Sequence, residues 1–250
     1  MRVILFLAVL LAGMSQAAAD MVQELRSGAR KACRDCDLRQ ANFKKADLSG
    51  VDLTGADLTG ARFHRAILRG TILKDVTAID ANFNVAQLRE ADLSGADLTA
   101  ALFYEADLSG ADLGKANLTG AKMQHVRATR AKLTNATLHT ADLTKARLNS
   151  VDFTGAVLHN TVLREASVGR SNFKGADISY VTIVQSDLAK TSFAGSTITF
   201  TDFWGSDLRA ADFSDASIQD SRFSRAQMTD AQIDGATIQR TFMADGRFQE

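Results

Sequence analysis

The sequence predicts an all-β protein, a four-sided parallel β-helix, from three observations. A five-residue pattern runs from Cys36 to Glu250 without insertion or deletion, with a small residue first and a large apolar residue third. Phenylalanines recur along this stretch at a spacing of twenty residues. The chain contains no proline, as expected where nearly every backbone N–H joins a ladder between coils. Short, fixed periods of this kind are typical of solenoids.

The period of five excludes uninterrupted regular elements. In a continuous α-helix, a step of five residues turns about 140°, so the large apolar residues would spread around the whole circumference. A flat strand fails because five is odd and alternate blocks would face opposite sides. The conflict disappears if the chain bends after each block. Glycine at the fifth position, as at Gly50 and Gly55, suits such bends.

The phenylalanine spacing predicts four sides per coil. Rings twenty residues apart would lie one strand spacing apart, about 4.8 Å, and could stack in offset fashion. A three-sided coil would need recurrence at fifteen residues, which the phenylalanines do not show nearly as well. Two columns carry the pattern: Phe43, Phe63, Phe83 and Phe103, and Phe153, Phe173, Phe193 and Phe213.

The individual blocks resemble a known family. Ala91-Asp92-Leu93-Ser94-Gly95 and Ala106-Asp107-Leu108-Ser109-Gly110 are similar to the repeats of the pentapeptide-repeat family, and the resemblance extends over residues 36–250. It implies a right-handed quadrilateral β-helix with four blocks per coil. The rod would then have roughly eleven coils and a length on the order of 50 Å.

Residues 1–19 read as a secretory signal peptide. Arg2 supplies the positive start, an apolar stretch follows, and Ala17-Ala18-Ala19 offers small residues for cleavage before Asp20. The apolar stretch is short for a transmembrane helix, so a retained membrane anchor is the less favoured alternative. Met14 stands where a lipoprotein would need its cysteine, which argues against lipidation. We therefore expect a periplasmic or secreted protein with no integral membrane segment after signal removal.

Residues 20–35 precede the regular repeat and are expected to cap the first coil. Met21, Val22, Leu25 and Ala29 lie within one helical stripe, and Asp20 suits the N-cap of that helix. A helix here would cover an edge that could otherwise recruit further strands.

Cys33 and Cys36 lie where the predicted cap meets the first coil. In an oxidising compartment they are candidates for a disulfide that pins the cap. Two reduced, buried cysteines are the first alternative. A redox-active C-x-x-C motif is the second, although no alternation of strands and helices surrounds it. A zinc site would need two further ligands that the neighbourhood does not supply.

The repeat domain, residues 36–250, ends without a capping helix. Phe242 and Phe248 could cover the last coil themselves. Alternatively, the bare end of the solenoid pairs with a second copy and gives a homodimer.

The surface charge bears on the most familiar role in the family. Relatives inhibit DNA gyrase by presenting an acidic, DNA-like rod, and such mimicry needs a dense negative surface. This chain has 29 basic and 29 acidic residues and no net charge. A DNA-mimic topoisomerase inhibitor is therefore a remote alternative, and we expect no nucleic-acid partner.

Two outward regions are candidates for an interaction surface. Arg127, Arg130, Arg147 and Arg170 are expected close together, without acidic residues in their coils. They are either solubilising charges or an electrostatic strip for an anionic cell-envelope polymer or an acidic protein face. Lys44, Lys45, Arg62 and Arg65 form a second basic patch near the N-terminal end.

The second candidate region is aromatic. Tyr180, Phe200 and Trp204 take outward positions in the C-terminal half, as do Val184 and Tyr104. Exposed apolar groups that cluster often mark a contact site, whereas isolated ones are normal.

Nothing in the repeat predicts an enzyme, a cofactor or a metal. Catalysis needs a concave pocket, and this core is filled by its own side chains. The aspartates before each central residue belong to the repeat itself. His139 and His159 hold the same position in successive coils and could share a metal ion, but no third ligand shares their column. His64 and His125 are expected as isolated surface residues.

The leading interpretation is a non-enzymatic extracytoplasmic binding or scaffold protein that presents a rigid surface to a protein or cell-envelope partner. The alternative is a structural spacer that assembles end to end. A spacer should pack terminus to terminus, whereas a binder should use a lateral face.

Overall fold

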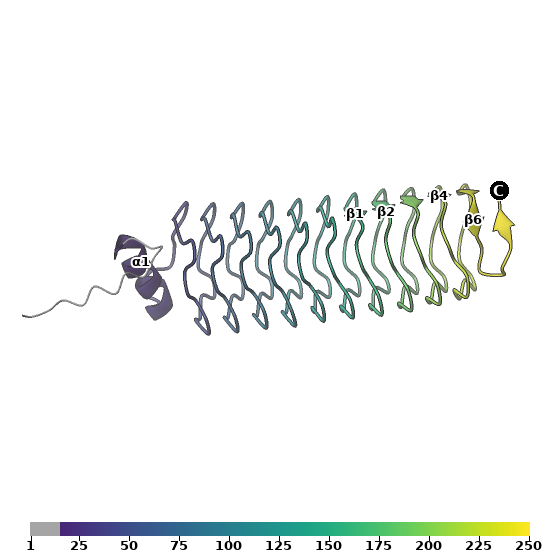
Figure 1. Ribbon diagram of the computed structural model, residues 1–250. Helices are drawn as coiled ribbons and strands as arrows, with labels where there is room; N and C mark the ends of the chain where they lie inside the picture. The colour runs from purple at the N-terminus through teal and green to yellow at the C-terminus, as the bar shows by residue number, and fades with distance from the viewer. Residues whose placement is uncertain (1–15) are drawn as a thin grey trace, which may run out of the picture.

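The computed structural model describes residues 16–250, which form a straight rod of stacked coils behind one short helix (Figure 1). Residues 1–15 of the predicted signal peptide, residues 1–19, lie outside the described residues. Parallel pairing joins residues twenty apart along the rod, from Ala32↔Asp52 to Arg222↔Phe242. Each coil therefore takes twenty residues on four sides, and the predicted fold class is confirmed.

The four faces can be named by their first central residues: the Leu38, Phe43, Leu48 and Leu53 faces, in chain order. Each face repeats every twenty residues, so the Phe43 face is centred on positions 43, 63 and so on to 223. The small and central residues of the blocks point inward and are buried along most of the rod, as Ala41 and Phe43 illustrate. A ladder of hydrogen bonds joins neighbouring coils, such as the 2.8 Å bond from the Leu38 N–H to the Asp57 carbonyl.

Stacked phenylalanines run through the core, as the twenty-residue spacing predicts. Phe63 and Phe83 stack with centroids 4.8 Å apart and planes inclined by 2°. On the Leu53 face, Phe173 stacks between Phe153 at 4.4 Å and Phe193 at 5.1 Å. Rings on opposite faces also meet edge to face across the core, with the Phe193 and Phe203 centroids 5.9 Å apart. Aromatic contacts therefore stabilise the core both along the rod axis and across it.

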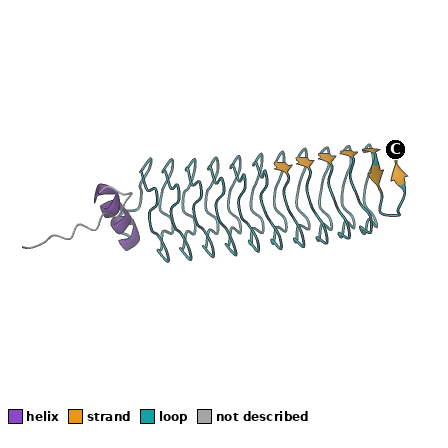
Figure 2. Ribbon diagram, viewed as in Figure 1, coloured by secondary structure: helices purple, strands orange, loops and turns teal. Residues whose placement is uncertain are grey.

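Among the described residues, regular strands occur only in the C-terminal half, on one face and at the terminal coil (Figure 2). Elsewhere each side pairs with the next coil through a single residue, because the chain turns again almost at once. On the Leu38 face five parallel strands pair in chain order, and an antiparallel pair closes the C-terminal end. The strands are β1 (Val157–His159), β2 (Asp177–Ser179), β3 (Thr197–Thr199), β4 (Ser217–Gln219), β5 (Thr237–Gln239), β6 (Thr241–Phe242) and β7 (Phe248–Gln249).

The corners depend on left-handed backbone at the fifth position of each block. Gly50 has a φ of 66°, and the bond from the Val51 N–H to the Leu48 carbonyl closes the turn. A positive φ at the third residue of such a turn is the type II pattern. Non-glycine residues such as Lys45 (φ 58°) adopt the same conformation at many corners.

Aspartates before the central residues brace these turns. The Asp52 carboxylate accepts hydrogen bonds from the Thr54 hydroxyl at 2.6 Å and from the Thr54 N–H at 3.0 Å. These bonds lower the pKa of Asp52 to about 2, and Arg34 contributes to the shift. The recurring Asp-Leu-Thr and Asp-Leu-Ser sequences therefore have a structural role in the turn.

The N-terminal cap is α1 (Gln16–Ser27), which lies across the first coil. Leu25 is fully buried against the core, and Met21 and Val22 pack beside it. Two details of the prediction were wrong. Asp20 lies inside the helix instead of capping it, because the alanines before it have high helix propensity and extend the helix. Ala29 follows the helix and is exposed. Within residues 16–250 no helix has the length and apolarity needed to cross a membrane.

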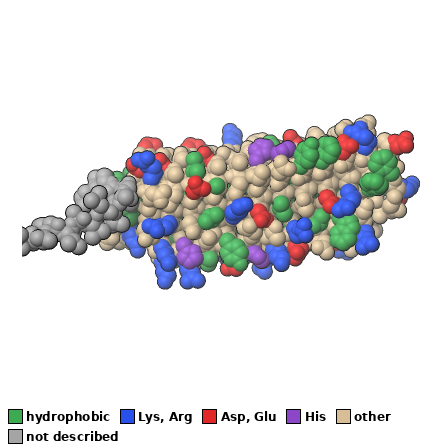
Figure 3. Space-filling view, in the orientation of Figure 1, with side chains coloured by type: hydrophobic (Ala, Val, Ile, Leu, Met, Phe, Trp, Pro, Cys, Tyr) green, Lys and Arg blue, Asp and Glu red, His purple; other side chains and the backbone are tan. Residues whose placement is uncertain are grey.

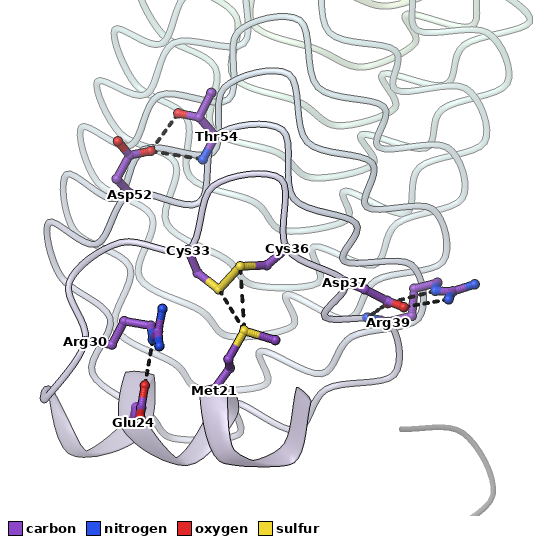
Figure 4. The surroundings of a disulfide bond; sticks show 9 residues. All are labelled: Met21, Glu24, Arg30, Cys33, Cys36, Asp37, Arg39, Asp52 and Thr54. Carbon is purple, nitrogen blue, oxygen red and sulfur yellow. Dashed lines mark hydrogen bonds and ion pairs between the residues drawn. A yellow bond between two sulfur atoms is a disulfide. The ribbon is translucent and has the colours of Figure 1, made fainter. Parts of the chain in front are cut away.

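Cys33 and Cys36 are joined by a disulfide at the junction of the cap and the first coil (Figure 4). The Met21 sulfur of α1 lies 3.8 Å from the Cys33 sulfur and 3.9 Å from the Cys36 sulfur. The Cys33 N–H also donates to the Asp52 carbonyl at 2.7 Å. The disulfide therefore sits between the helix and the ladder.

Replacing both cysteines with serine is expected to lower the free energy of unfolding by about 2 kcal/mol, because the closed loop is very short. Urea denaturation of the variant and the parent measures this difference. A thiol titration of the unreduced, denatured parent should detect no free thiol. Two titratable thiols in protein from the native compartment would show that the bond does not form there.

The last coil is only partly covered. Strands β6 and β7 fold back as an antiparallel pair, and the Phe242 and Phe248 rings lie 4.9 Å apart. Each of these side chains stays half exposed, and Ile233 beside them is 45% exposed. The terminal phenylalanines therefore pair with one another without sealing the end of the core.

Candidate functional site: one face edged by aromatic side chains

The Phe43 face is bordered by two corners that differ from the rest of the surface. The first corner, between the Leu38 and Phe43 faces, carries outward positions 39 and 40 and their equivalents every twenty residues. The second corner, between the Phe43 and Leu48 faces, carries positions 44 and 45 and their equivalents. Aromatic and imidazole side chains line both.

On the first corner, four rings form a continuous ladder along the rod axis. His139 and His159 meet edge to face at 5.5 Å, and His159 meets Tyr180 in the same way at 5.3 Å. Tyr180 then stacks on Phe200 at 4.7 Å with a 10° tilt. A 3.0 Å hydrogen bond joins the His159 Nδ1 to the Ser179 hydroxyl. The ladder spans four successive coils, and its Tyr180 and Phe200 rings are about half exposed.

The second corner carries two smaller contacts of related geometry. Tyr104 meets His125 edge to face at 5.5 Å, and the Arg225 guanidinium lies 5.5 Å from the centre of the Trp204 ring. Glu105 raises the pKa of Tyr104 through a hydrogen bond and its negative charge. His125 is therefore not the isolated residue that the sequence predicted.

The sequence interpretation also missed Arg225, because it compared only residues twenty apart. Three of the contacts join residues twenty-one apart: Tyr104 with His125, His159 with Tyr180, and Trp204 with Arg225. They run diagonally from the fourth position of one block to the fifth position of the block in the next coil.

These side chains are distributed very unevenly around the rod. The chain has four histidines, two tyrosines and one tryptophan, and all of them lie on these two corners. Phe200 joins them, and before the terminal coil no other described phenylalanine points outward. Figure 3 shows the consequence, with histidines and bulky hydrophobic side chains along both long edges of the face in view. The Phe43 face with its two corners is hereafter the aromatic face.

The backbone of the first corner is also distinctive. In the C-terminal coils, the extended segment on the Leu38 face includes the fourth residue of the block, as in β1 to β5. The chain turns only after that residue. Tyr180 and Phe200 occupy the left-handed positions that follow, with φ values of 56° and 49°. A bulky residue in this conformation costs about 1–2 kcal/mol. The fold tolerates this cost at two adjacent coils, and both rings remain exposed.

The exposed fractions define where the aromatic face is accessible. Tyr180, Phe200 and Tyr104 are 50%, 51% and 44% exposed, whereas Trp204 is partly buried. Val184 was expected to point into solvent, but only 8% of it is exposed. It occupies the same column as Trp204, one coil earlier, so the large indole is its neighbour one strand spacing away. Val184 therefore forms part of the buried base of the aromatic face.

Two ion pairs neutralise part of the charge within the C-terminal half of the aromatic face. Arg222 and Asp202 form a bidentate ion pair across successive coils, which raises the pKa of Arg222. Lys145 and Glu165 pair at 3.4 Å on the second corner. Between these pairs lie Val162 and Thr182. This half of the face is therefore close to neutral and partly apolar.

The arginine surface does not have the uniform charge that the sequence suggested. Arg127 lies 3.7 Å from Asp107 of the preceding coil, and Arg147 continues the same column. Asp187 follows two coils later. Arg130 and Arg170 lie on a different corner, and Arg170 borders a hollow of about 160 Å³ that also includes Asp187. The expected absence of acidic neighbours was wrong, because successive coils bring aspartates into the arginine column.

No cluster of three potential metal ligands occurs within residues 16–250. His139 and His159 contact each other through their ring edges, and no carboxylate or cysteine joins them there. Surface hollows are shallow and lined by outward side chains of neighbouring coils. One, of about 420 Å³, is bordered by Lys74, Asp75 and Lys115.

A sequence model for pentapeptide repeats matches residues 33–75 and 81–243. The chain belongs to the pentapeptide-repeat family, whose right-handed quadrilateral β-helix is the fold described above. No curated protein matches the whole sequence significantly.

Among solved structures similar to this chain, that of HetL shows the same fold. HetL, which is involved in heterocyst differentiation regulation in the cyanobacterium Nostoc, is 22% identical with a TM-score of 0.57, over 92% of this chain and 98% of HetL. Rfr23 from the cyanobacterium Cyanothece is 25% identical with a TM-score of 0.45, over 47% of this chain and 92% of its own. QnrB1, a plasmid-mediated fluoroquinolone resistance protein, is 22% identical with a TM-score of 0.32, over 83% and 93%.

Proposed function

We propose that this protein is a non-enzymatic extracytoplasmic binding or scaffold protein whose aromatic face is the lateral contact surface for a partner protein. One observation carries the proposal: the outward aromatic and imidazole side chains of the coils all border a single face. Aromatic residues are enriched at protein interfaces because they contribute large contact areas with few rotatable bonds.

Two further features support a protein partner over an anionic polymer. The ladder of His139, His159, Tyr180 and Phe200 places partly exposed rings in a line along one corner of the rod, which suits an extended groove or strand. The ion pair of Asp202 with Arg222 neutralises both charges within that column of the face. The neutral chain as a whole also argues against mimicry of DNA.

One observation supports the alternative hypothesis, a structural spacer that assembles end to end. Ile233, Phe242 and Phe248 leave the C-terminal end of the core partly exposed, and apolar ends of this kind are suited to pairing with a second copy. A homodimer through this end would leave the aromatic face free, so the two roles are compatible.

The extracytoplasmic location rests on the N-terminal sequence and can be tested directly. Fractionation of the source cells followed by N-terminal sequencing should recover the protein in the periplasm or medium, with a mature N-terminus close to Asp20. Recovery of the full-length chain from the cytosol would contradict the proposed location. It would leave the aromatic face as a candidate surface for a cytosolic partner.

A further inference from the structure

A basic hollow lies on the Phe43 face at the N-terminal end of the rod, away from the aromatic ladder. Its volume is about 370 Å³, and Asn42, Lys44, Arg62, His64 and Asn82 line it. Figure 3 shows lysine and arginine side chains gathered at this end of one long edge, with a histidine among them. All five lining side chains carry hydrogen-bond donors or a titratable ring.

The coil geometry brings these groups together from residues distant in sequence. Asn42, Arg62 and Asn82 form one column of parallel bridges, and Lys44 and His64 share a second column. Successive members of each column lie about 4.8 Å apart, so two adjacent columns surround the hollow on a rigid frame.

Additional positive charge surrounds the hollow. The Arg26 guanidinium of α1 donates to the Asn42 carbonyl at 2.6 Å. Lys45 and Arg65 follow Lys44 and His64 at the second corner and are exposed.

No ion pair neutralises this positive charge within the described residues, whereas several arginines elsewhere on the rod are paired. Arg127, Arg222 and Arg240 each pair with an aspartate twenty residues earlier. By contrast, no ion pair among residues 16–250 involves Lys44, Lys45, Arg62 or Arg65.

Asp80 lies on the first corner two residues before Asn82, but it does not line the hollow. Other carboxylates near the hollow in the coil register lie further away or on another face. On the Phe43 face and its second corner, the first carboxylate after Lys45 is Glu105, three coils further along, or about 14 Å. Asp47 lies on the Leu48 face, where the Ser49 N–H and hydroxyl occupy its carboxylate. The positive charges of Lys31 and Arg69 also lower the pKa of Asp47.

The donor set indicates the class of ligand. A lysine ammonium, a planar guanidinium and amide N–H groups arranged around a small hollow suit a tetrahedral oxyanion with several acceptor atoms. We propose that this hollow binds a phosphate group, either free or carried on a linear polyanion that continues along the basic corner. The proposal does not depend on the function proposed for the aromatic face.

The test uses the mature, disulfide-intact protein, with inorganic phosphate and long-chain polyphosphate as separate probes in calorimetric titrations. The variant Lys44→Gln/Arg62→Gln should weaken binding at least about tenfold, since hydrogen bonds to charged groups contribute about 1.5–3 kcal/mol each. The matched control Arg130→Gln/Arg170→Gln removes the same charge from another corner and should change binding less than about twofold.

The two probes separate the possible sources of the phosphate. Site-specific binding of inorganic phosphate supports a free ligand, whereas binding of polyphosphate alone supports a polymer. Equal losses in the variant and the control would overturn the site in favour of general charge attraction. Failure of the parent protein to bind either probe at low salt would also overturn it. Thermal denaturation of both variants checks that the fold is intact.

Discussion

The double substitution Tyr180→Gly/Phe200→Gly is expected to abolish capture of the partner. It should change the free energy of unfolding by less than about 1 kcal/mol. Both residues have a positive φ, which glycine adopts without strain. Relief of that strain, about 1–2 kcal/mol per residue, is offset by the lost ring stack and by the greater freedom of glycine in the unfolded chain. Binding, in contrast, loses two half-exposed aromatic anchors.

The measurement is retention of native envelope proteins on the immobilised mature rod, with urea denaturation in parallel. The control variant is Arg170→Gly/Lys190→Gly, which alters the same turn position on the opposite corner, where both residues have a φ of 61°. The control should retain the partner. Loss of capture in the control but not in the Tyr180/Phe200 variant would transfer the binding surface to the arginine side.

The second large effect concerns the buried phenylalanine stack on the Leu53 face. Phe173→Ala is expected to lower the free energy of unfolding by about 3–5 kcal/mol, the usual range for a buried phenylalanine. Phe173 is fully buried between Phe153 and Phe193, so the change removes two stacking contacts as well as leaving a cavity.

Two matched variants separate these contributions. Phe173→Leu keeps much of the volume and should show a smaller loss. Phe43→Ala lies at the end of its column, where Phe63 at 5.2 Å is its stacking partner, and should lose less by roughly the value of one ring pair, about 0.5–1.5 kcal/mol. Denaturation followed by both circular dichroism and fluorescence measures the differences. A loss below about 1 kcal/mol for Phe173→Ala would show that the stack contributes little.

The repeat made the interior predictable from the sequence. Each block carries its own inward pair, so Ala41 and Phe43 could be placed without knowledge of any distant residue. The columns of Phe43 and Phe153 followed from arithmetic on the same register. The boundaries of the cap were less predictable, because alanines before Asp20 serve both as a cleavage signal and as strong helix formers.

The candidate site was predictable in its residues but not in its contacts. Tyr180, Phe200 and Trp204 stood out as outward aromatic residues. Their relation to His159 and Arg225 depends on how a side chain leans from one coil toward the next, which a register of twenty does not describe. The prediction for the arginine surface was wrong for a different reason: Asp107 lies twenty residues before Arg127, so the same register places it next to Arg127 from the preceding coil, and the prediction did not include it.

The central claim is that the aromatic face, and not the opposite wall, contacts the partner. A photo-crosslinking amino acid placed at Thr182 or at Ser192 tests this most directly, because the two residues are partly buried and hold the same position in blocks half a coil apart. Illumination in the native compartment should give a discrete crosslinked product from position 182 and none from position 192. Equal products from both positions, or a product from position 192 alone, would contradict the account.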